Sequence, residues 1–261
     1  MAIHLPLSPK HTFQIIRAFA LFTIIILAST PALADLEIPV WCYYNEPPFA
    51  IGQDQGLEHD IVNLLNEESK GQFTFYLVSM SRKRLDTFLK AGRTGIALFV
   101  SPIWMEEKGK ANFVWSPPLL HDKNEIVSRK SFPVNYSGPE SVYGLTIAGV
   151  HGHKYKDLDS AVAQGKIKRR DAKNMALNLR TVIENHGNDF TTIPKSTLGY
   201  LLLKFGYKDK AYISPTPLAK YTRHLLLNNP SPKLKKFIFN FVAKLKKNKK
   251  WRKIKDTYQI H

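Results

Sequence analysis

The sequence is poor in cysteine and has no cluster of metal-binding side chains. Its 261 residues include one cysteine, Cys42, so no disulfide can form within the chain and the fold must hold by packing alone. The nine histidines are scattered, apart from His151 and His153, and no third ligand follows at a recognisable spacing. The sequence therefore predicts no metal site.

Several motifs of enzyme chemistry are also missing. The chain contains no G-x-G-x-x-G, no G-x-x-x-x-G-K-[ST] and no G-x-S-x-G. Nucleotide cradles and the hydrolase nucleophile elbow therefore lack support. No internal repeat or low-complexity run is present either. We expect no cofactor.

Only one long hydrophobic run occurs, and it lies near the N-terminus. Lys10 and Arg17 precede "AFALFTIIILAST", and Ala32-Leu33-Ala34 forms a small-x-small site before Asp35. This layout predicts a secretory signal peptide over 1–34, cleaved before Asp35. An uncleaved anchor is the alternative, but the run is short of the ~20 residues that a span needs. Without lipid attachment or disulfides, the mature chain is expected in a bacterial periplasm.

Acidic residues are few relative to basic ones. Lys and Arg number 38 against 21 Asp and Glu, which gives a formal net charge of +17, and eleven of the cations lie between Lys233 and Lys255. Such an excess indicates either an anionic partner, such as a membrane surface, or a solvated helix face. We favour the solvated face. The export signal argues against nucleic acid as a partner.

What is present alternates between strand and helix. With 44% hydrophobic residues the chain can bury a core. Residues 38–44, 73–79 and 94–100 have strand patterns, and helix patterns begin at Leu57 and at Arg82. This β-α-β-α-β order indicates a parallel sheet covered by helices. Residues 124–130 have the pattern of a further extended segment.

A second α/β series follows the Pro/Ser/Gly-rich stretch "SFPVNYSGPESVYG", which is typical of a boundary. Strand patterns lie at 145–150 and 210–215, with helix patterns between them. The chain closes with an amphipathic helix whose apolar positions are spaced i, i+3, i+4, i+7, i+8 and i+11. These positions are Leu234, Phe237, Ile238, Phe241, Val242 and Leu245. A membrane-surface helix is the alternative to a core-facing one.

An ordered set of segments carries a family resemblance. They are "NEPPFA", "GLEHDIVNLL", "RLDTFLKAGRTGIALFVSPIW", "FVWSPPLL", "LTIAGVHGHKY", "LGYLLLKFGYKDKAYIS" and "FVAKLKKNKKWRKIKDTY". Together they resemble the periplasmic solute-binding proteins of the polar amino-acid ABC-transporter type, the bacterial extracellular solute-binding protein family 3. The resemblance covers nearly the whole mature chain.

The resemblance implies an α/β fold of type II, with two lobes and a hinge of two crossovers. Lobe 1 is expected at 35–130 and 223–261, and lobe 2 at 131–222. A solute would bind in the cleft at the strand ends and helix N-termini, and the lobes would close over it. Asp60 matches the aspartate at the family's helix start, which we interpret as structural.

The resemblance and the loop positions together nominate eight ligand-binding residues. They are Tyr44, Glu46, Phe49, Ser101, Trp104, His151, Gly152 and Ser214. Each also has an ordinary structural interpretation, such as a core position for Phe49 and a helix cap for Ser101.

Two charged anchors of the family are missing here. Family members carry Thr-x-x-Arg after the third strand, where the arginine forks onto the ligand carboxylate. This chain has "SPIWMEEKGK", with Ser101 and Trp104 but no arginine, and Ser214 stands in place of the aspartate that holds the ligand ammonium. The loss of both anchors argues against an ordinary free α-amino acid and leaves an amino-acid-like or related polar solute as the expected ligand. Glu46 and Trp104 favour a cationic, aromatic or otherwise different solute.

The favoured function is a non-catalytic, monomeric periplasmic protein that binds a small polar solute. It would deliver the solute to an inner-membrane ABC permease or report it to a sensor. An enzyme on the same scaffold, of the dehydratase kind, is the first alternative, with Glu46 as the one early acid–base candidate. A basic protein that binds the envelope surface is the second.

Overall fold

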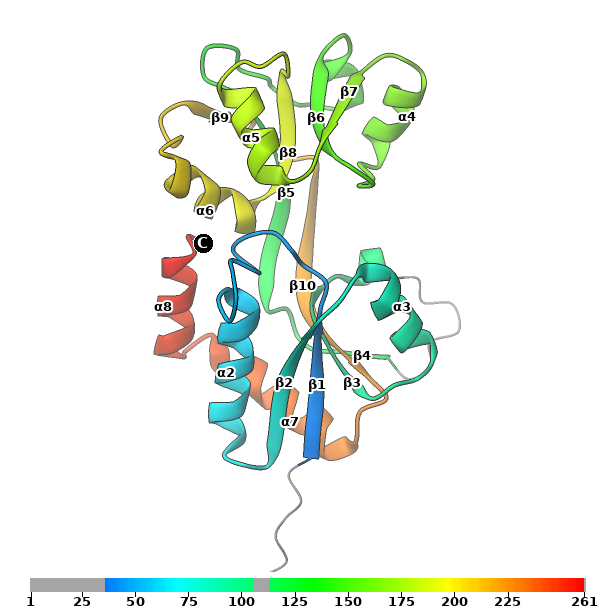
Figure 1. Ribbon diagram of the computed structural model, residues 1–261, viewed down its shortest axis with the longest axis vertical. Helices are drawn as coiled ribbons and strands as arrows, with labels where there is room; N and C mark the ends of the chain where they lie inside the picture. The colour runs from blue at the N-terminus through cyan, green and yellow to red at the C-terminus, as the bar shows by residue number, and fades with distance from the viewer. Residues whose placement is uncertain (1–35, 106–112, 261) are drawn as a thin grey trace, which may run out of the picture. The chain divides into compact units, whose positions relative to one another are not determined.

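The computed structural model describes residues 36–105 and 113–260 (Figure 1). The predicted signal peptide and its cleavage site lie outside the described residues. No helix within those two ranges is long and apolar enough to cross a membrane.

The first half of the sheet is formed mainly by the N-terminal strands. β2 (Phe73–Ser79), β1 (Leu36–Cys42) and β3 (Gly95–Val100) are neighbours in that order, and β1 runs parallel to β3. β10 (Ala219–Asn228) returns from far along the chain and pairs antiparallel with β3 and with β4 (Phe113–Trp115). A parallel pair of strands needs a crossover, and the helices between them provide it.

Helices cover both faces of this half. They are α2 (Leu57–Ser69), α3 (Arg82–Lys90), α7 (Pro232–Leu245) and α8 (Lys249–Thr257). Alternate residues of β1 enter different clusters: Val40 packs with residues of α2 and α7, while Trp41 packs with Leu85 and Leu89 of α3. Burial on both faces explains why β3 is apolar without interruption.

The second half has its own strands and helices. The strands are β5 (Leu120–Arg129), β8 (Phe190–Pro194), β6 (Thr146–Val150) and β7 (Lys168–Ala172) in sheet order, with β9 (Ala211–Ile213) paired to β5. The helices are α4 (Asp157–Ala163), α5 (Met175–Ile183) and α6 (Lys195–Phe205), with a short 3-10 turn at η2 (Pro139–Val142). Another 3-10 turn, η1 (Pro102–Trp104), follows β3 of the first half. Two further apolar clusters pack on this half.

Two long strands connect the halves. β5 and β10 pair antiparallel from Ala219↔Asn124 to Arg223↔Leu120. From His224 onward β10 pairs with β3, and the register shifts between His224 and Leu226. Figure 1 shows both strands running from one half of the sheet to the other. The pairing of β10 therefore changes at Arg223 and His224.

The C-terminal helix α7 uses its apolar stripe inside the protein. Leu234, Ile238, Phe241, Val242 and Leu245 are all buried and belong to the cluster of the first half. Ser231 caps the helix by accepting a hydrogen bond from Leu234 N at 3.2 Å. The apolar face is thus occupied by the core, and the lysines of α7 lie on its other sides.

Candidate functional site

The floor of the site lies on one face of three strands. Tyr221 lies opposite Asp122 and Asn124 lies opposite Pro194 in the register, so these side chains share a face. Tyr221 Oη donates to Asn124 Oδ1 at 3.0 Å. Arg223 follows Tyr221 at the next position on the same face. The ends of β5, β8 and β10 therefore present a polar floor where the two halves of the sheet meet.

A cavity of about 250 Å³ opens above this floor. Its lining combines the loop after β1, the turn after β3, the loop after β6, the first residues of α5 and α6, and the floor itself. The residues are Tyr43, Tyr44, Asn45, Glu46, Phe49, Trp104, Asn124, His153, Lys154, Tyr155, Met175, Thr192, Pro194, Thr197, Tyr221 and Arg223. Both halves of the sheet contribute to it.

The loop after β1 is fixed by the start of α2. Leu57 N donates to Pro48 O at 2.8 Å and Glu58 N donates to Phe49 O at 3.1 Å. These bonds satisfy two of the N–H groups that a helix leaves unpaired at its N-terminus. Gly56 precedes the helix at φ 126°, where a side chain would be strained and would collide with Phe49 O. The loop is thereby held with Phe49 buried against the cavity.

Aromatic rings form one wall of the cavity. Tyr44 stacks on Tyr43 and on Phe49, with ring centroids 4.5 Å apart in each pair. Trp104 meets Tyr221 edge to face at 4.8 Å. Offset-stacked and edge-to-face pairs are the favoured geometries of such rings. The wall is therefore already packed before any solute enters.

The guanidinium of Arg223 lies among these rings. Its Nε donates to Asp122 Oδ2 at 2.6 Å, Nη1 to Tyr44 Oη at 2.6 Å, and Nη2 to Tyr221 Oη at 3.3 Å. The side chain is 1% exposed. Burial by itself lowers the pKa of Arg223, because it disfavours the cation. The phenols of Tyr44 and Tyr221 and the Asp122 carboxylate have a larger opposite effect, so the pKa is raised and the residue stays charged.

Asp122 is anchored as firmly as Arg223. Its Oδ1 accepts from Ser196 N at 3.1 Å and from Lys123 N at 2.9 Å, and its Oδ2 accepts from Ser196 Oγ at 2.6 Å. Ser196 lies in the first turn of α6, where unpaired N–H groups favour an anion. The ion pair thus joins β5, β10 and α6 at one point beneath the cavity.

Glu46 connects the loop after β1 to the start of α5. Its Oε1 accepts from Met175 N at 3.1 Å. The residue is 9% exposed. Burial raises the pKa of Glu46, and the bond from Met175 opposes that rise. Asn174 caps the same helix by accepting from Leu177 N at 2.9 Å. A carboxylate of the first half is therefore held by a helix N-terminus of the second half.

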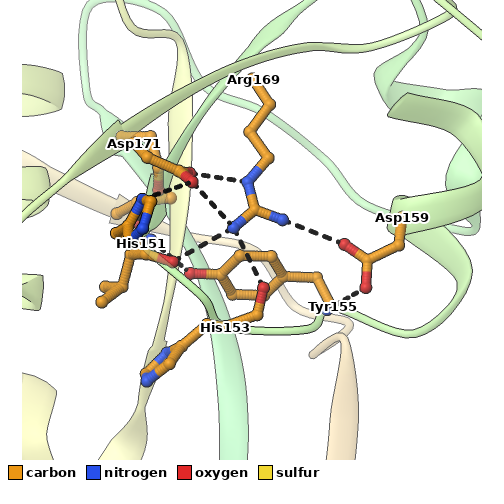
Figure 2. A network of polar contacts seen from close by, with 9 residues as sticks. His151, His153, Tyr155, Asp159, Arg169 and Asp171 are labelled. Carbon is orange, nitrogen blue, oxygen red and sulfur yellow. Dashed lines mark hydrogen bonds and ion pairs between the residues drawn. The ribbon is translucent and has the colours of Figure 1, made fainter. Parts of the chain in front are cut away.

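The loop after β6 is held by Arg169, as Figure 2 shows. Arg169 Nη2 donates to the carbonyls of Val150 and His153 at 3.1 and 3.0 Å, while its Nε donates to Asp171 at 2.6 Å. The guanidinium also lies 5.0 Å from the Tyr155 ring. Desolvation and the Arg169 charge lower the pKa of His153, which favours a neutral imidazole on the cavity rim.

One polar atom of the lining lacks a protein partner. Thr192 Oγ1 is buried and makes no hydrogen bond within the described residues. Its side chain shares a face with Asn124 and Pro194, on the cavity side of β8. A buried hydroxyl without a partner is costly, so an unpaired hydroxyl at a cavity wall indicates a place where a ligand can bind.

The eight nominated residues divide into two groups. Tyr44, Glu46, Phe49 and Trp104 line the cavity. The other four fall outside the lining among the described residues. Ser101 is buried at the start of η1 without a side-chain capping bond, and Ser214 Oγ accepts from Tyr136 N at 2.9 Å. His151 is exposed and lies 4.0 Å from Asp171, and Gly152 follows it at φ 78°.

The polar residues of the cavity floor could not be identified from the sequence. Arg223, Asp122, Asn124 and Thr192 were not nominated. A weak signal existed, because Tyr221 and Arg223 alternate immediately before the apolar run Leu225–Leu227. Asp60, which the sequence marked as structural, accepts from Tyr258 Oη at 2.6 Å and joins α2 to the C-terminal end.

Comparison with known proteins gives structural similarity only. No family model matches the chain, and no curated protein matches it significantly. Among solved structures, the GluR0 ligand-binding core from Nostoc punctiforme in complex with L-glutamate is 16% identical, with a TM-score of 0.64 over 85% of this chain and 98% of that chain.

Two further structures have similar values. The ancestral amino acid-binding protein AncCDT-1, a precursor of cyclohexadienyl dehydratase, is 15% identical, with a TM-score of 0.61 over 85% of this chain and 95% of that one. The substrate-binding protein of an amino acid ABC transporter is 15% identical, with a TM-score of 0.59 over 85% and 98%. The predicted two-lobed α/β fold with two crossover strands is thus confirmed.

Proposed function

We propose that this chain is an exported solute-binding protein of the polar amino-acid ABC-transporter type, which captures a small polar solute in the cavity above β5, β8 and β10. The observation that carries the proposal is the origin of the lining, to which both halves of the sheet contribute at the strands that link them. A cavity in this position changes shape when the halves move, so a bound solute favours one arrangement over the others.

The lobes are assigned as 35–130 with 223–261, and 131–222. β5 and β10 are the crossovers about which the lobes hinge. The hydrogen bond from Met175 N to Glu46 is a direct contact between the two lobes and belongs to the closed arrangement. A solute that adds bonds to both sides, such as one to Thr192 and one to the aromatic wall, would stabilise closure further.

The place of action follows from the N-terminal segment. A cleaved signal peptide over 1–34 directs the mature chain to the periplasm. The solute would then pass to an inner-membrane permease or be reported to a sensor. The similarity to an amino acid ABC transporter's substrate-binding protein supports the first of these. The chain acts as a monomer.

A thermal-shift screen of the purified protein against polar solutes tests this function. A ligand that binds only the folded form raises the melting temperature, by a stabilisation of about 2.7 kcal/mol at a concentration of 100 Kd. We expect at least one small polar solute to raise it, and chemical analysis of the mixture to return that solute unchanged. A complete screen without any shift contradicts the proposal.

An enzyme on the same scaffold is the second candidate. Glu46 favours it, because it lines the cavity with a pKa raised by burial, and a carboxyl of that kind can act as a general acid. The likeness to a precursor of cyclohexadienyl dehydratase points the same way. Conversion of the stabilising solute in the screen, lost in Glu46→Gln, would favour this function over simple binding.

A further inference from the structure

Arg223 fills a cage that has the composition of a cation-binding site. Four rings surround its guanidinium, and the distances from the guanidinium carbon to their centroids are short. They are 4.8 Å to Phe49, 5.2 Å to Tyr44, 5.3 Å to Trp104 and 5.3 Å to Tyr221. Aromatic cages of this kind recognise cationic ligands because each ring face carries negative charge. Here the chain supplies the cation itself.

The caged cation is also neutralised from within the protein. Asp122 binds Nε at 2.6 Å and is itself held by Ser196 and the backbone of Lys123. A buried ion pair with further hydrogen bonds to both partners is costly to separate. The guanidinium is therefore a fixed part of the site, and a solute cannot displace it easily.

A cationic solute has little to bind in the remaining space. Arg223 occupies the aromatic cage, and Lys154 adds another positive charge to the lining. Glu46 is the one acidic side chain among the described lining residues, and its Oε1 already accepts from Met175 N. A second cation would lose its hydration there while the cage and Asp122 are already occupied by Arg223, and such a loss without a new partner is costly.

The free polar groups of the cavity are mostly donors. A guanidinium has five N–H groups, and the described residues accept from four: Asp122, Tyr44, the Phe99 carbonyl at 3.3 Å and Tyr221. One N–H at Nη2 therefore remains. The Thr192 hydroxyl has no partner within the described residues, and Lys154 offers an ammonium. Donors of this kind match a carboxylate.

Resting on the proposed solute-binding function, we infer that Arg223 is the specificity-determining residue of the cleft. Its guanidinium takes the place of a ligand cation in the aromatic cage, so that the cleft accepts small carboxylates without a cationic end and rejects guanidinium and ammonium side chains. This inference replaces the cationic solute that Trp104 and Glu46 suggested in the sequence, because the cation that Trp104 contacts belongs to the chain.

Three probes of matched shape and different charge test the inference on the unaltered protein. Benzoate, benzamide and benzamidine share a planar shape and differ in charge, so their relative affinities report the electrostatic preference of the cavity. We expect calorimetry to give benzoate the highest affinity and benzamidine the lowest, with about tenfold or more between them, as one lost charged interaction produces. Benzamidine binding as tightly as benzoate overturns the inference and leaves the proposed function standing.

The variant Arg223→Ala tests the cage itself by chemical rescue. We expect the variant to melt at a lower temperature, and millimolar methylguanidinium to restore part of the loss while the neutral methylurea does not. The unaltered protein should respond to neither, because its cage is full. The double variant Arg223→Ala/Asp122→Asn should lose the rescue, since the partner charge is gone.

The outcomes separate the possibilities. A folded Arg223→Ala variant that methylguanidinium does not stabilise shows that Arg223 has only a structural role and overturns the inference. If Arg223→Ala does not fold, the three shape-matched probes on the unaltered protein decide alone. If no probe binds and the wider solute screen also finds nothing, the proposed function fails, and this inference fails with it.

Discussion

The aromatic side chains that contact Arg223 differ in how much the fold depends on them. Phe49 and Tyr221 are buried, whereas Trp104 is half-buried at the end of a short turn. Trp104 contacts Tyr221 and the Arg223 guanidinium, and both contacts face the cavity. Of these rings, Trp104 is therefore the one whose removal should affect binding more than folding.

We expect Trp104→Ala to weaken binding of the solute found in the screen by about 1–2 kcal/mol, or roughly 5- to 30-fold, because an aromatic contact of the wall is lost. The melting temperature without solute should change little. Titration calorimetry and thermal melts measure the two effects. The matched control is Trp115→Ala: Trp115 packs against His224 outside the cavity lining and should affect stability alone. Unaltered affinity in Trp104→Ala would refute the assignment of this wall.

The raised pKa of Glu46 gives a pH-dependent prediction. Burial favours the neutral carboxyl, so the folded protein holds a proton that the unfolded chain releases near the ordinary value of 4.5. Stability contributed by this group therefore falls as pH rises above that value toward the folded pKa, and stays lower beyond it. Glu46→Gln has no such charge, and its amide oxygen can still accept from Met175 N. Its melting temperature relative to the unaltered protein should rise with pH across that window.

Calorimetric melts from acidic to neutral buffer measure this difference. Glu46→Ala serves as the control, because it removes both the charge and the acceptor of the Met175 bond. It should be less stable than Glu46→Gln at every pH, by about 1 kcal/mol for the lost hydrogen bond. A difference between Glu46→Gln and the unaltered protein that is flat or falls with pH contradicts the assignment.

Not every residue of the site could be read from the sequence. Trp104, Glu46, Tyr44 and Phe49, which line the cavity, could be nominated because they follow strands in Pro-rich loops, where binding residues concentrate. Arg223 could not be placed, because its role depends on the register between β5 and β10, which brings it against a carboxylate 101 positions earlier. Local patterns do not specify such long-range pairing.

At the scale of elements, the loop after β1 and the helix α2 form one unit. The loop carbonyls of Pro48 and Phe49 accept the first N–H groups of the helix, and Gly56 provides the backbone conformation between them. A defect at this junction should therefore reach the cavity through Phe49.

We expect Gly56→Ala to destabilise the protein by roughly 1–3 kcal/mol, because the residue would be strained and its Cβ would collide with the Phe49 carbonyl. Solute affinity should fall as well, since Phe49 lines the cavity. The matched control is Gly71→Ala, which also has a positive φ, 77°, but no atom near its added Cβ and lies after α2. Denaturant melts and titrations compare the two. Equal affinity in both variants would contradict the coupling.

The elements that the sequence predicted are those with a clear apolar pattern. The strands and helices between 38 and 100 alternate as expected, because covered strands are apolar and the helices have one apolar side. β7 and β10 were not predicted. β7 reads "KRRDA" and is a largely exposed strand at the edge of the sheet, and β10 begins with the polar residues of the cavity floor. Neither β7 nor the start of β10 has the alternation of hydrophobic and polar residues that predicts a strand.

For the molecule as a whole, the proposed function requires the two lobes to move relative to each other about β5 and β10. The boundary predicted at 130 directly follows β5, whereas the one predicted at 222 falls within β10, which changes its pairing partner from β5 to β3 directly after Arg223. The ion pair of Arg223 with Asp122 lies at this point. If the proposed hinge lies here, residues at this point would absorb the change in backbone angles on closure.

Small-angle X-ray scattering measures whether the lobes close over a solute. The purified protein is measured alone and with a saturating concentration of the solute that raises its melting temperature most. We expect a smaller radius of gyration with solute than without it, because the lobes close over the bound solute. An identical scattering curve, on a sample that calorimetry shows to be saturated, would mean that the solute binds without closure and would contradict the account.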